Sequence, residues 1–346
     1  MSSAEVHDGF VRVRDGDHTA DFHLRWLRHN CDLDRHPQTG ERVIESADLP
    51  EVLAVDEAVV DDAVLRVRWQ FDQRVSRYPV AWLRQHAYAT DREAVPPPPS
   101  VVRAIEIDGS AAIPALAARV LDLLRTHGAA LVRREVRAPE DETEAWIAAF
   151  LVNGLDVIGT HFGRIEDLRT DNTTNTNTDQ LGYTDAAIGL HTDQPFLDEV
   201  PRYQLLQGVR AADEGGDTVL ADARAAFAYL ASIDAEAARR LTSTPVRFHR
   251  KQKAFERELI SPIIVEQPFQ IRSSYFTAAP YQIPFAEMES WYRAHDRFIR
   301  IVRTHQYQFR LGAGDVLVYD NHRMLHGRTA FRGGRWVRGV YFQPRA

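Results

Sequence analysis

The 346-residue sequence has a single cysteine, very few lysines and no long apolar run. One cysteine, Cys31, excludes an intrachain disulfide framework and any zinc or iron–sulfur site built from several thiolates, and it is typical of a reducing cytoplasm. Because no stretch of about 18 apolar residues occurs and the first residues lack a secretory pattern, we expect a cytoplasmic protein without a membrane span. The formal net charge of −7 argues against binding to nucleic acid or to anionic membranes.

Lysine occurs only at positions 251 and 253. A phosphate-binding loop needs a longer glycine-rich turn that ends in lysine, and the short Gly-Gly-Asp-Thr segment at 215–218 does not provide one. Hydrophobic residues make up 44% of the chain and charged residues 26%, which is typical of a folded protein with a sizeable core. At about 150 residues per domain, the length allows one large domain or two unequal ones.

Four consecutive prolines at 96–99 mark the clearest boundary, since such a run favours a stiff connector and cannot lie inside a helix or a paired strand. We therefore divide the chain into a small N-terminal domain at 1–95, a linker at 96–100 and a large domain at 101–346. In the small domain, segments such as 10–13 and 64–69 alternate apolar and polar residues, as half-buried strands do.

The large domain combines strands with a few helices. Amphipathic spacing and turn residues predict helices near 113–127, 139–153, 222–233 and 284–302, and strand patterns dominate from 189 onward. This order predicts a mainly β fold with flanking helices, in which two antiparallel sheets form a barrel. The polar run at 171–179 has no periodicity and is either a solvated loop or a lid over the substrate.

The first chemical signal is His191 with Asp193. They stand two apart at the end of a strand-like segment, so their side chains point to one face. A second strand-like segment runs into a turn and presents His326, and two histidines with one carboxylate are the ligand set of non-haem Fe(II) oxygenases. The rival is a helical pair of His322 and His326, which the β-branched, alternating residues before it disfavour, so we expect His322 to be structural.

A third element lies nine residues after His326, where Arg335 opens a strand at 336–342. A guanidinium at the base of a pocket can hold a dicarboxylate through two parallel hydrogen bonds. Arg338 is the alternative residue for this role.

Together these segments resemble the 2-oxoglutarate/Fe(II) dioxygenases of the taurine dioxygenase superfamily, and within it the gamma-butyrobetaine and trimethyllysine hydroxylase branch. The similarity covers nearly the whole chain. Its most specific parts are Trp-Leu-Arg-His-Asn-Cys at 26–31 and Leu-His-Gly-Arg at 325–328. It also rests on residues 36–40, 78–83, 190–193, 215–218, 320–324 and 335–341.

The resemblance implies a double-stranded β-helix, or jelly-roll, catalytic core behind a small β-rich N-terminal domain, often assembled as a homodimer. It implies Fe(II) on His191, Asp193 and His326, and 2-oxoglutarate as cosubstrate with O₂. Thr218 and Arg335 would hold the distal carboxylate of 2-oxoglutarate. The expected reaction hydroxylates an unactivated C–H bond of a small zwitterion that contains an amine, betaine- or amino-acid-like, and releases succinate and CO₂.

The chain departs from this branch at a zinc site. Members of the branch typically bind a structural zinc through three cysteines and a histidine, whereas here only Cys31 remains and Gln73 stands at the histidine position. A tetrahedral zinc site needs four nitrogen or sulfur ligands, so we predict no structural zinc and a small domain held by packing alone. The chain also stops at 346, where members usually continue for another helix, so we expect part of the usual dimer contact to be missing.

The second departure concerns the substrate. Gamma-butyrobetaine hydroxylases surround a trimethylammonium group with aromatic rings, and the matching positions here are Phe162, Glu166 and Tyr183. A quaternary ammonium has no N–H to donate, whereas a carboxylate such as Glu166 suits an amine that donates hydrogen bonds. We therefore expect a substrate other than gamma-butyrobetaine, with its acid end, a carboxylate or phosphonate, toward Arg272. The alternative is that Glu166 is simply solvated and Arg272 forms a structural ion pair.

Three alternative functions stay open. The same oxidative chemistry can end in desaturation, cyclisation or C–N cleavage, and the ligands do not distinguish these outcomes. A zinc hydrolase with the same three ligands would need a general base and no carboxylate clamp. A non-catalytic barrel that binds a small molecule would retain the metal-like residues only by descent.

Overall fold

The computed structural model describes residues 3–16, 18–86, 105–170, 181–253 and 255–345. The proline run at 96–99 and the polar run at 171–179 lie outside these residues. The domain boundary and the lid therefore stay predictions.

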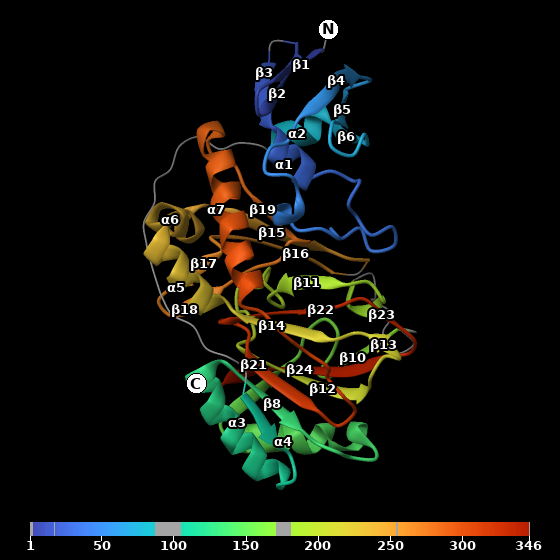
Figure 1. Cartoon of the computed structure of the whole chain (residues 1–346), viewed down its shortest axis with the longest axis vertical. Helices are drawn as coiled ribbons and strands as arrows, with labels where there is room; N and C mark the ends of the chain where they lie inside the picture. Colours follow the sequence, from blue (N-terminus) through green and yellow to red (C-terminus); the bar gives the residue numbers. More distant parts are fainter. Residues whose placement is uncertain (1–2, 17, 87–104, 171–180, 254, 346) are drawn as a thin grey trace.

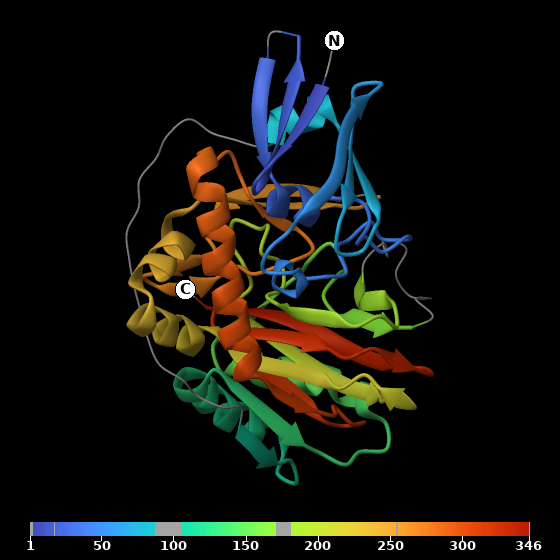
Figure 2. The ribbon, with the colours of Figure 1, turned by 45° about the horizontal axis from the view of Figure 1, so that its top comes forward.

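Two β-sheets form the centre of the molecule (Figures 1 and 2). Their strands are β7 (Ile105–Asp108), β8 (Ala129–Arg133), β9 (Leu155–Ile158), β10 (Glu166–Arg169), β11 (Ile188–His191), β12 (Tyr203–Arg210), β14 (Thr218–Asp222), β20 (Tyr307–Phe309), β21 (Val316–Asp320), β22 (Met324–Arg328) and β24 (Trp336–Pro344). The large sheet has the order β10-β24-β12-β21-β8-β7, with β9 also beside β24, and the small sheet has the order β11-β22-β14-β20. The β7–β8 pair is parallel, whereas the neighbours β8–β21, β21–β12 and β12–β24 are antiparallel.

Apolar side chains from both sheets fill the space between them. Leu131, Leu206 and Leu317 from the large sheet form one buried cluster with Leu220 and Met324 from the small sheet. Alternation along each strand sends these residues inward and their neighbours outward. The mainly β fold with a jelly-roll core and flanking helices is thereby confirmed.

Helices cover the outer face of the large sheet. They are α3 (Ile113–His127) and α4 (Thr143–Val152), the latter preceded by the 3-10 turn η2 (Pro139–Glu142). Leu116, Val120 and Phe150 pack with strand residues such as Val318 in a second buried cluster. Helix α3 ends at Gly128, which adopts the left-handed conformation at φ +82° and donates its N–H to Leu124 O at 3.0 Å.

A second helical group lies beside the small sheet and consists of α5 (Ala223–Ile233), α6 (Ala235–Ser243) and α7 (Phe285–Thr304) (Figure 1). Asp222 caps α5 by accepting a hydrogen bond from Ala225 N at 3.1 Å. The remaining short strands are β15 (Val246–Lys251), β16 (Glu256–Ser261), β17 (Ile264–Glu266), β18 (Phe269–Ile271) and β19 (Ala278–Pro280), together with the pair β13 (Glu214–Gly215) and β23 (Phe331–Arg332), which lies on the opposite side of the molecule from α5–α7 in Figure 1.

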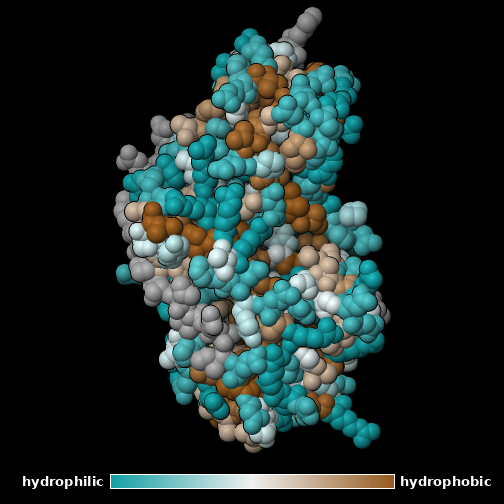
Figure 3. Space-filling model, in the orientation of Figure 1, coloured by the Kyte–Doolittle hydropathy of each residue, from teal (hydrophilic) through white to brown (hydrophobic). Residues whose placement is uncertain are grey.

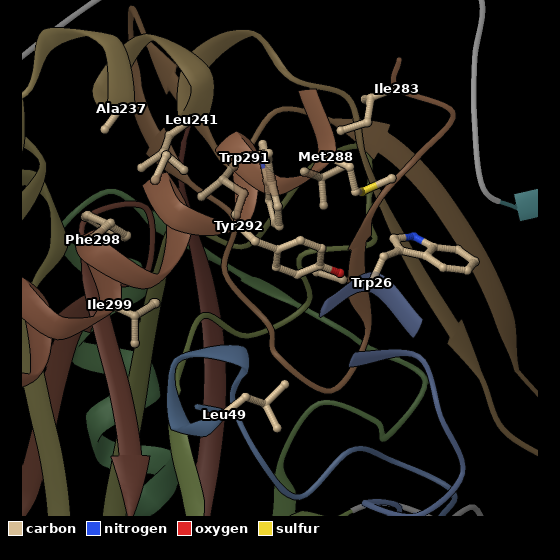
Figure 4. Packing of buried hydrophobic residues seen from close by; sticks show 14 of the residues in the cluster. Trp26, Leu49, Ala237, Leu241, Ile283, Met288, Trp291, Tyr292, Phe298 and Ile299 are labelled. Carbon is tan, nitrogen blue, oxygen red and sulfur yellow. The ribbon is translucent and has the colours of Figure 1, made fainter. Parts of the chain in front are cut away.

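Residues 3–86, which we call the front segment, form the top of the molecule in Figure 1. The segment contains two three-stranded sheets and short helices: β1 (Ser3–His7), β2 (Phe10–Asp15), β3 (His18–His23), α1 (Leu24–His29), η1 (Ser46–Asp48), β4 (Val55–Asp61), β5 (Val64–Trp69), β6 (Val75–Pro79) and α2 (Val80–His86). Trp26 and Leu49 lie in one buried cluster with Met288, Trp291 and Tyr292 of α7 (Figure 4). The front segment therefore shares a hydrophobic core with the rest of the chain.

Charged side chains surround Cys31 in the front segment. The Arg28 guanidinium donates to Cys31 Sγ at 2.9 Å and to Asp72 Oδ2 at 2.9 Å, and it also pairs with Asp34. Arg74 joins the two carboxylates, at 2.7 Å from Asp34 and 2.9 Å from Asp72. The expectation that packing alone holds this segment is therefore wrong, because an ion-pair cluster also joins its loops.

The face seen in Figure 3 is largely hydrophilic, with apolar patches scattered between polar regions. Within the described residues, no helix combines the length and the apolar character needed to cross a bilayer.

Candidate active site

A pocket of about 110 Å³ lies where the two sheets face each other. Strands β10, β12 and β24 of the large sheet and strands β11, β14 and β22 of the small sheet all contribute side chains to its wall. The pocket contains His191, Asp193 and His326.

These three side chains form a compact ligand set. One potential ligand atom from each lies within 4.8 Å of the others. His191 Nε2 is 3.3 Å from Asp193 Oδ1, and His326 Nε2 is 3.9 Å from Asp193 Oδ2. Two imidazoles and one carboxylate on one side of a pocket leave the other side open for further ligands of a metal ion.

The sheet brings the two histidines together. His191 on β11 and His326 on β22 are cross-strand partners, although 135 positions separate them in the sequence. Gly327 permits this approach, because a Cβ atom at that position would lie 2.7 Å from Ile188 O on β11. The glycine of the Leu-His-Gly-Arg motif is thus required by the packing of the two strands.

The protonation of the set suits metal binding. Burial, together with the nearby His191, lowers the pKa of His326 to about 3, so its imidazole is neutral at neutral pH. Burial opposes ionisation of Asp193, yet its polar surroundings, which include the hydrogen bond donated by the Tyr341 hydroxyl, hold the pKa of its carboxyl well below the usual range. His191 Nδ1 lies 2.9 Å from Gly189 O, a contact that makes Nδ1 the donor and frees Nε2 to bind a metal.

Two residues that the sequence did not single out fix Asp193. The buried Asn321 side chain accepts from Asp193 N at 2.9 Å and donates to Asp193 O at 3.0 Å. The Tyr341 hydroxyl donates to Asp193 Oδ2 at 2.7 Å. Asn321 lies within the Asp-Asn-His-Arg segment, and Tyr341 lies three residues after Arg338 on β24, where alternation along the strand would have placed it on the pocket face.

Arg335 and Thr218 both line the pocket. Burial lowers the pKa of Arg335 to about 10, and among the described residues its guanidinium has no carboxylate partner. It lies 5.8 Å from the centroid of the Phe331 ring. A half-buried cation without a carboxylate partner among the described residues is suited to receive an anionic group.

Arg338 is not in the pocket, contrary to the alternative expectation. Its guanidinium donates to Asp167 Oδ1 at 3.0 Å and to Glu140 O at 2.8 Å. Since Arg335, Val337 and Tyr341 line the pocket, the residue at 338 must point to the opposite face of the strand.

Of the predicted substrate residues, Phe162 and Glu166 line the pocket, and Tyr183 lies directly behind them. The Tyr183 hydroxyl donates to Glu166 Oε1 at 3.2 Å, and the Tyr183 ring centroid is 6.2 Å from that of Phe162. Glu166 is 5% exposed, which contradicts the alternative of a solvated surface side chain. The three residues therefore form one wall, made of a buried carboxylate and two rings.

Arg272 does not line the pocket, and the expectation that it faces the substrate is wrong. Its guanidinium donates to the backbone carbonyls of Pro195 at 2.8 Å, Leu197 at 2.6 Å and Asp198 at 3.1 Å. These bonds hold the loop after Asp193 and leave Arg272 in a structural role.

A different arginine, Arg250 on β15, lines the pocket. It forms an ion pair with Glu41 of the front segment, and both side chains are buried. Glu41 also accepts a hydrogen bond from Leu181 N, in the same short turn as Tyr183. The front segment thus contributes directly to the pocket wall. A contact over about 200 residues leaves no local pattern in the sequence, which is why it was missed.

The chain was compared with protein families and with characterised proteins. Residues 90–341 match the family model described as taurine catabolism dioxygenase TauD, TfdA family. Gamma-butyrobetaine dioxygenase of Pseudomonas sp. strain AK-1 is 31% identical over 350 residues, which span 92% of this chain and 87% of that protein. Trimethyllysine dioxygenase of the yeast Meyerozyma guilliermondii is 24% identical over 368 residues, with 94% and 88% covered.

Solved structures share the fold. PvcB of Pseudomonas aeruginosa has a TM-score of 0.52 and 20% identity, with 74% of this chain and 93% of that chain covered. An asparagine oxygenase solved with Fe(II), hydroxyasparagine and succinate has a TM-score of 0.51 and 15% identity, with 66% and 78% covered. The family match over most of the chain, together with the first of the relatives above, shows that this protein belongs to the TauD/TfdA dioxygenase family.

Proposed function

We propose that the protein is an Fe(II)- and 2-oxoglutarate-dependent dioxygenase that hydroxylates an unactivated C–H bond of a small zwitterion carrying an amine. The observation that carries this proposal is the set of His191, Asp193 and His326 in a pocket that also contains the uncompensated cation Arg335. Such a set with a carboxylate-binding cation is the arrangement that this chemistry requires.

Each residue has a role in this proposal. His191, Asp193 and His326 would hold Fe(II), while Arg335 and Thr218 would hold the far carboxylate of 2-oxoglutarate. Bound iron, with 2-oxoglutarate and O₂, supplies the oxidising power for C–H cleavage. Asn321 and Tyr341 keep the Asp193 carboxylate in place, and the apolar wall that includes Leu168, Leu206 and Val337 excludes water from the reacting groups.

The wall formed by Phe162, Glu166 and Tyr183 supports an amine substrate. A buried carboxylate favours an N–H donor in a charge-assisted hydrogen bond. The Tyr183 hydroxyl donates to Glu166 Oε1 and helps to position the carboxylate at the pocket wall. We therefore propose a primary or secondary amine, and not a quaternary ammonium group, at Glu166.

The test of the reaction is 2-oxoglutarate-dependent release of succinate during a screen of amino acids and small betaines. His191→Ala should release no succinate above background. His322→Gln is the control, because His322 lies just before β22, the strand that carries His326, but its Nε2 contacts Val200 O at 2.9 Å, outside the pocket. If a folded His191→Ala variant still decarboxylates 2-oxoglutarate, the ligand assignment is wrong.

The Glu166→Gln variant tests whether Glu166 binds an amine of the substrate. It should lose turnover of amine substrates by about 10- to 100-fold, the range for loss of a charge-assisted hydrogen bond, while unstimulated 2-oxoglutarate decarboxylation persists. Strong turnover of gamma-butyrobetaine by the wild type, with none of primary amines, would contradict the assignment of Glu166.

Two alternative functions, a zinc hydrolase and a non-catalytic binding protein, predict different measurements from a dioxygenase. A zinc hydrolase would act without O₂, and a non-catalytic barrel would release no succinate. Neither explains why a half-buried arginine without a carboxylate partner among the described residues lines the metal pocket. Anaerobic addition of Fe(II) and 2-oxoglutarate should give a weak visible absorption band, which neither rival would show.

We also propose that the enzyme is a cytoplasmic homodimer. The single cysteine supports a reducing compartment, and the resemblance to the gamma-butyrobetaine hydroxylase branch supports a dimer. Sedimentation velocity at micromolar concentration tests the second point, and a monomer would contradict it.

A further inference from the structure

A second cavity, of about 190 Å³, lies between the front segment and the short strands β15 and β19. Its lining contains three arginines and two histidines, and no aspartate or glutamate is found among the described residues that form it. The charged and aromatic members are Arg35, Arg42, Arg247, His86, His249, Trp26, Trp82, Phe276 and Tyr281. The volume exceeds that of one water molecule, about 30 Å³, several times.

Two of these arginines are bound to carbonyl oxygens and not to carboxylates. The Arg42 guanidinium donates to Tyr275 O and Ala278 O, both at 2.6 Å, and to Asn30 Oδ1 at 3.1 Å. Arg35 donates to Cys31 O at 3.3 Å and to Gly40 O at 2.8 Å. Carbonyl groups fix the position of a guanidinium without forming an ion pair with it, whereas buried charges are ordinarily paired.

Several buried donors at this cavity lack an acceptor. Arg42 Nε, Arg247 Nε and Trp26 Nε1 are buried and have no hydrogen-bond partner among the described residues. Arg42 is 6% exposed and Trp26 is 2% exposed. These nitrogens are themselves shielded from the cavity, so a ligand there would meet the charge of the guanidinium groups and not these N–H groups.

We propose that this cavity is a binding site for a small organic anion with a carboxylate or phosphate group. Arg35 and Arg42 supply positive charge that forms no ion pair with a carboxylate among the described residues. Arg247 already donates to Glu258 at 2.5 Å through one terminal nitrogen, so its charge is partly offset and adds less to the lining than that of Arg35 or Arg42. The rings of Trp82, Tyr281 and Phe276 give apolar walls that suit an organic anion better than a bare ion.

The site is distinct from the catalytic pocket, with which it shares one lining residue, Phe276. The Phe276 ring lies edge-on to His191, with centroids 5.3 Å apart. The proposed site therefore does not depend on the proposed reaction, and it can be tested with the full-length protein whether or not the enzyme turns over.

The experiment is a titration of the metal-free full chain with citrate and, separately, with inorganic phosphate at constant ionic strength. Calorimetry gives the affinity, and the fluorescence of Trp26 and Trp82 reports binding at the cavity. Saturable binding of one anion per chain is expected for at least one probe. Binding of citrate alone identifies a carboxylate ligand, and binding of phosphate alone identifies a phosphate ligand.

Two variants locate the binding site by independent means. Arg247→Gln removes a positive charge from the lining, and Ala279→Leu fills the cavity opposite Arg247 without changing charge, since the two residues are cross-strand partners. Each should weaken binding at least about 10-fold, the effect of losing roughly 1.4 kcal/mol. Arg257→Gln, an exposed arginine on β16 outside the cavity, and Arg335→Gln, in the catalytic pocket, should bind like the wild type.

The proposal is overturned by the absence of saturable binding for both probes. It is also overturned if binding persists unchanged in a folded Arg247→Gln or Ala279→Leu variant, or if binding is lost in Arg335→Gln. Circular dichroism identifies the folded variants, and Ala279→Leu decides the question if Arg247→Gln does not fold.

Discussion

Asn321 and Tyr341 hold Asp193 from two sides, one at its backbone and the other at its carboxylate. The spacing of His191 and Asp193 was enough to predict the ligands, because alternation along a strand is a local property. The supporting residues lie 128 and 148 positions away from Asp193, so only the folded sheet brings them to it. Such supporting contacts orient ligands and tune their affinity for a metal.

Removal of the Asn321 side chain should therefore weaken metal binding. Asn321→Ala loses both bonds to the Asp193 backbone, and we expect Fe(II) affinity to fall by about 10- to 100-fold. Anaerobic Fe(II) titration measures this, with His322→Gln as the neighbouring control. Unchanged affinity in a folded Asn321→Ala variant would contradict the role.

Arg335, directly before β24, and Arg338, on β24, can each be replaced by glutamine, which removes one positive charge in either case. Arg335→Gln should raise the KM for 2-oxoglutarate by about 10- to 150-fold, since a hydrogen bond to a charged group is worth about 1.5 to 3 kcal/mol. Arg338→Gln should change that KM little, because its partners are Asp167 and Glu140. Initial-rate kinetics over a range of 2-oxoglutarate concentrations compare the two, and equal effects would argue against the clamp.

At the scale of helices and strands, the sequence pattern predicted those features that depend only on the residues of one segment. The helix expected at 113–127 is α3, with the same bounds, because its apolar stripe and the glycine after it are both encoded in the segment. Alternation along the strand also predicts which side chains of β24 face the pocket, since residues 335, 337 and 341 share one face and 338 lies on the other.

The parallel pairing of β7 with β8 was not predicted, and neither were the short helices α1 and α2. Helix α1 has six residues, all of them buried, and is stabilised by its surroundings more than by its own periodicity. The same holds for Arg272 and Arg250, whose roles follow from which loop packs over which strand.

Helix α7 carries a pH-sensitive contact with the front segment. Burial opposes protonation of His295, but Glu45 and Asp296 raise the pKa of its imidazole above the ordinary value of about 6.5. Ser46 Oγ also lies 3.2 Å from His295 Nδ1. Because the pKa is raised in the folded state, this stabilisation is complete below about pH 6.5 and is lost as the pH rises through the folded pKa.

We therefore expect the free energy of unfolding to fall between about pH 6 and about pH 9 by more in the wild type than in His295→Gln. The difference arises because the unfolded wild type releases the His295 proton at a lower pH than the folded wild type does, whereas glutamine has no proton to release. Urea unfolding at both pH values gives the comparison. Identical pH dependence in the two proteins would show that His295 is not charged in the folded state.

At the scale of the whole molecule, the front segment and the second helical group are parts of one packed body. The buried cluster that includes Trp26, Leu49 and Trp291 crosses from one to the other without a break (Figure 4). The ion pair between Glu41 and Arg250 crosses the same boundary at the catalytic pocket. The pocket is therefore complete only when the front segment is in place.

Because one buried cluster joins the front segment and the second helical group, we expect the two parts to unfold in a single transition. Trp291→Ala should cost about 3 to 5 kcal/mol and lower the stability of both parts together, since it opens a cavity at their boundary. Val152→Ala, at a site that is 87% exposed, should stay within about 0.5 kcal/mol of the wild type. Urea unfolding followed by tryptophan fluorescence and by far-UV circular dichroism should give coincident curves, and two separated transitions would contradict one cooperative unit.

The rate at which a thiol reagent labels Cys31 measures how often the front segment opens. Cys31 is the chain's single thiol, it is 2% exposed, and burial raises its pKa, so a thiol reagent reaches and reacts with it only when the loops around it separate. The labelling rate of the unmodified protein therefore reads out how often the ion-pair cluster around it opens under native conditions. Cys31 is therefore an internal probe of how often the front segment opens in the folded protein.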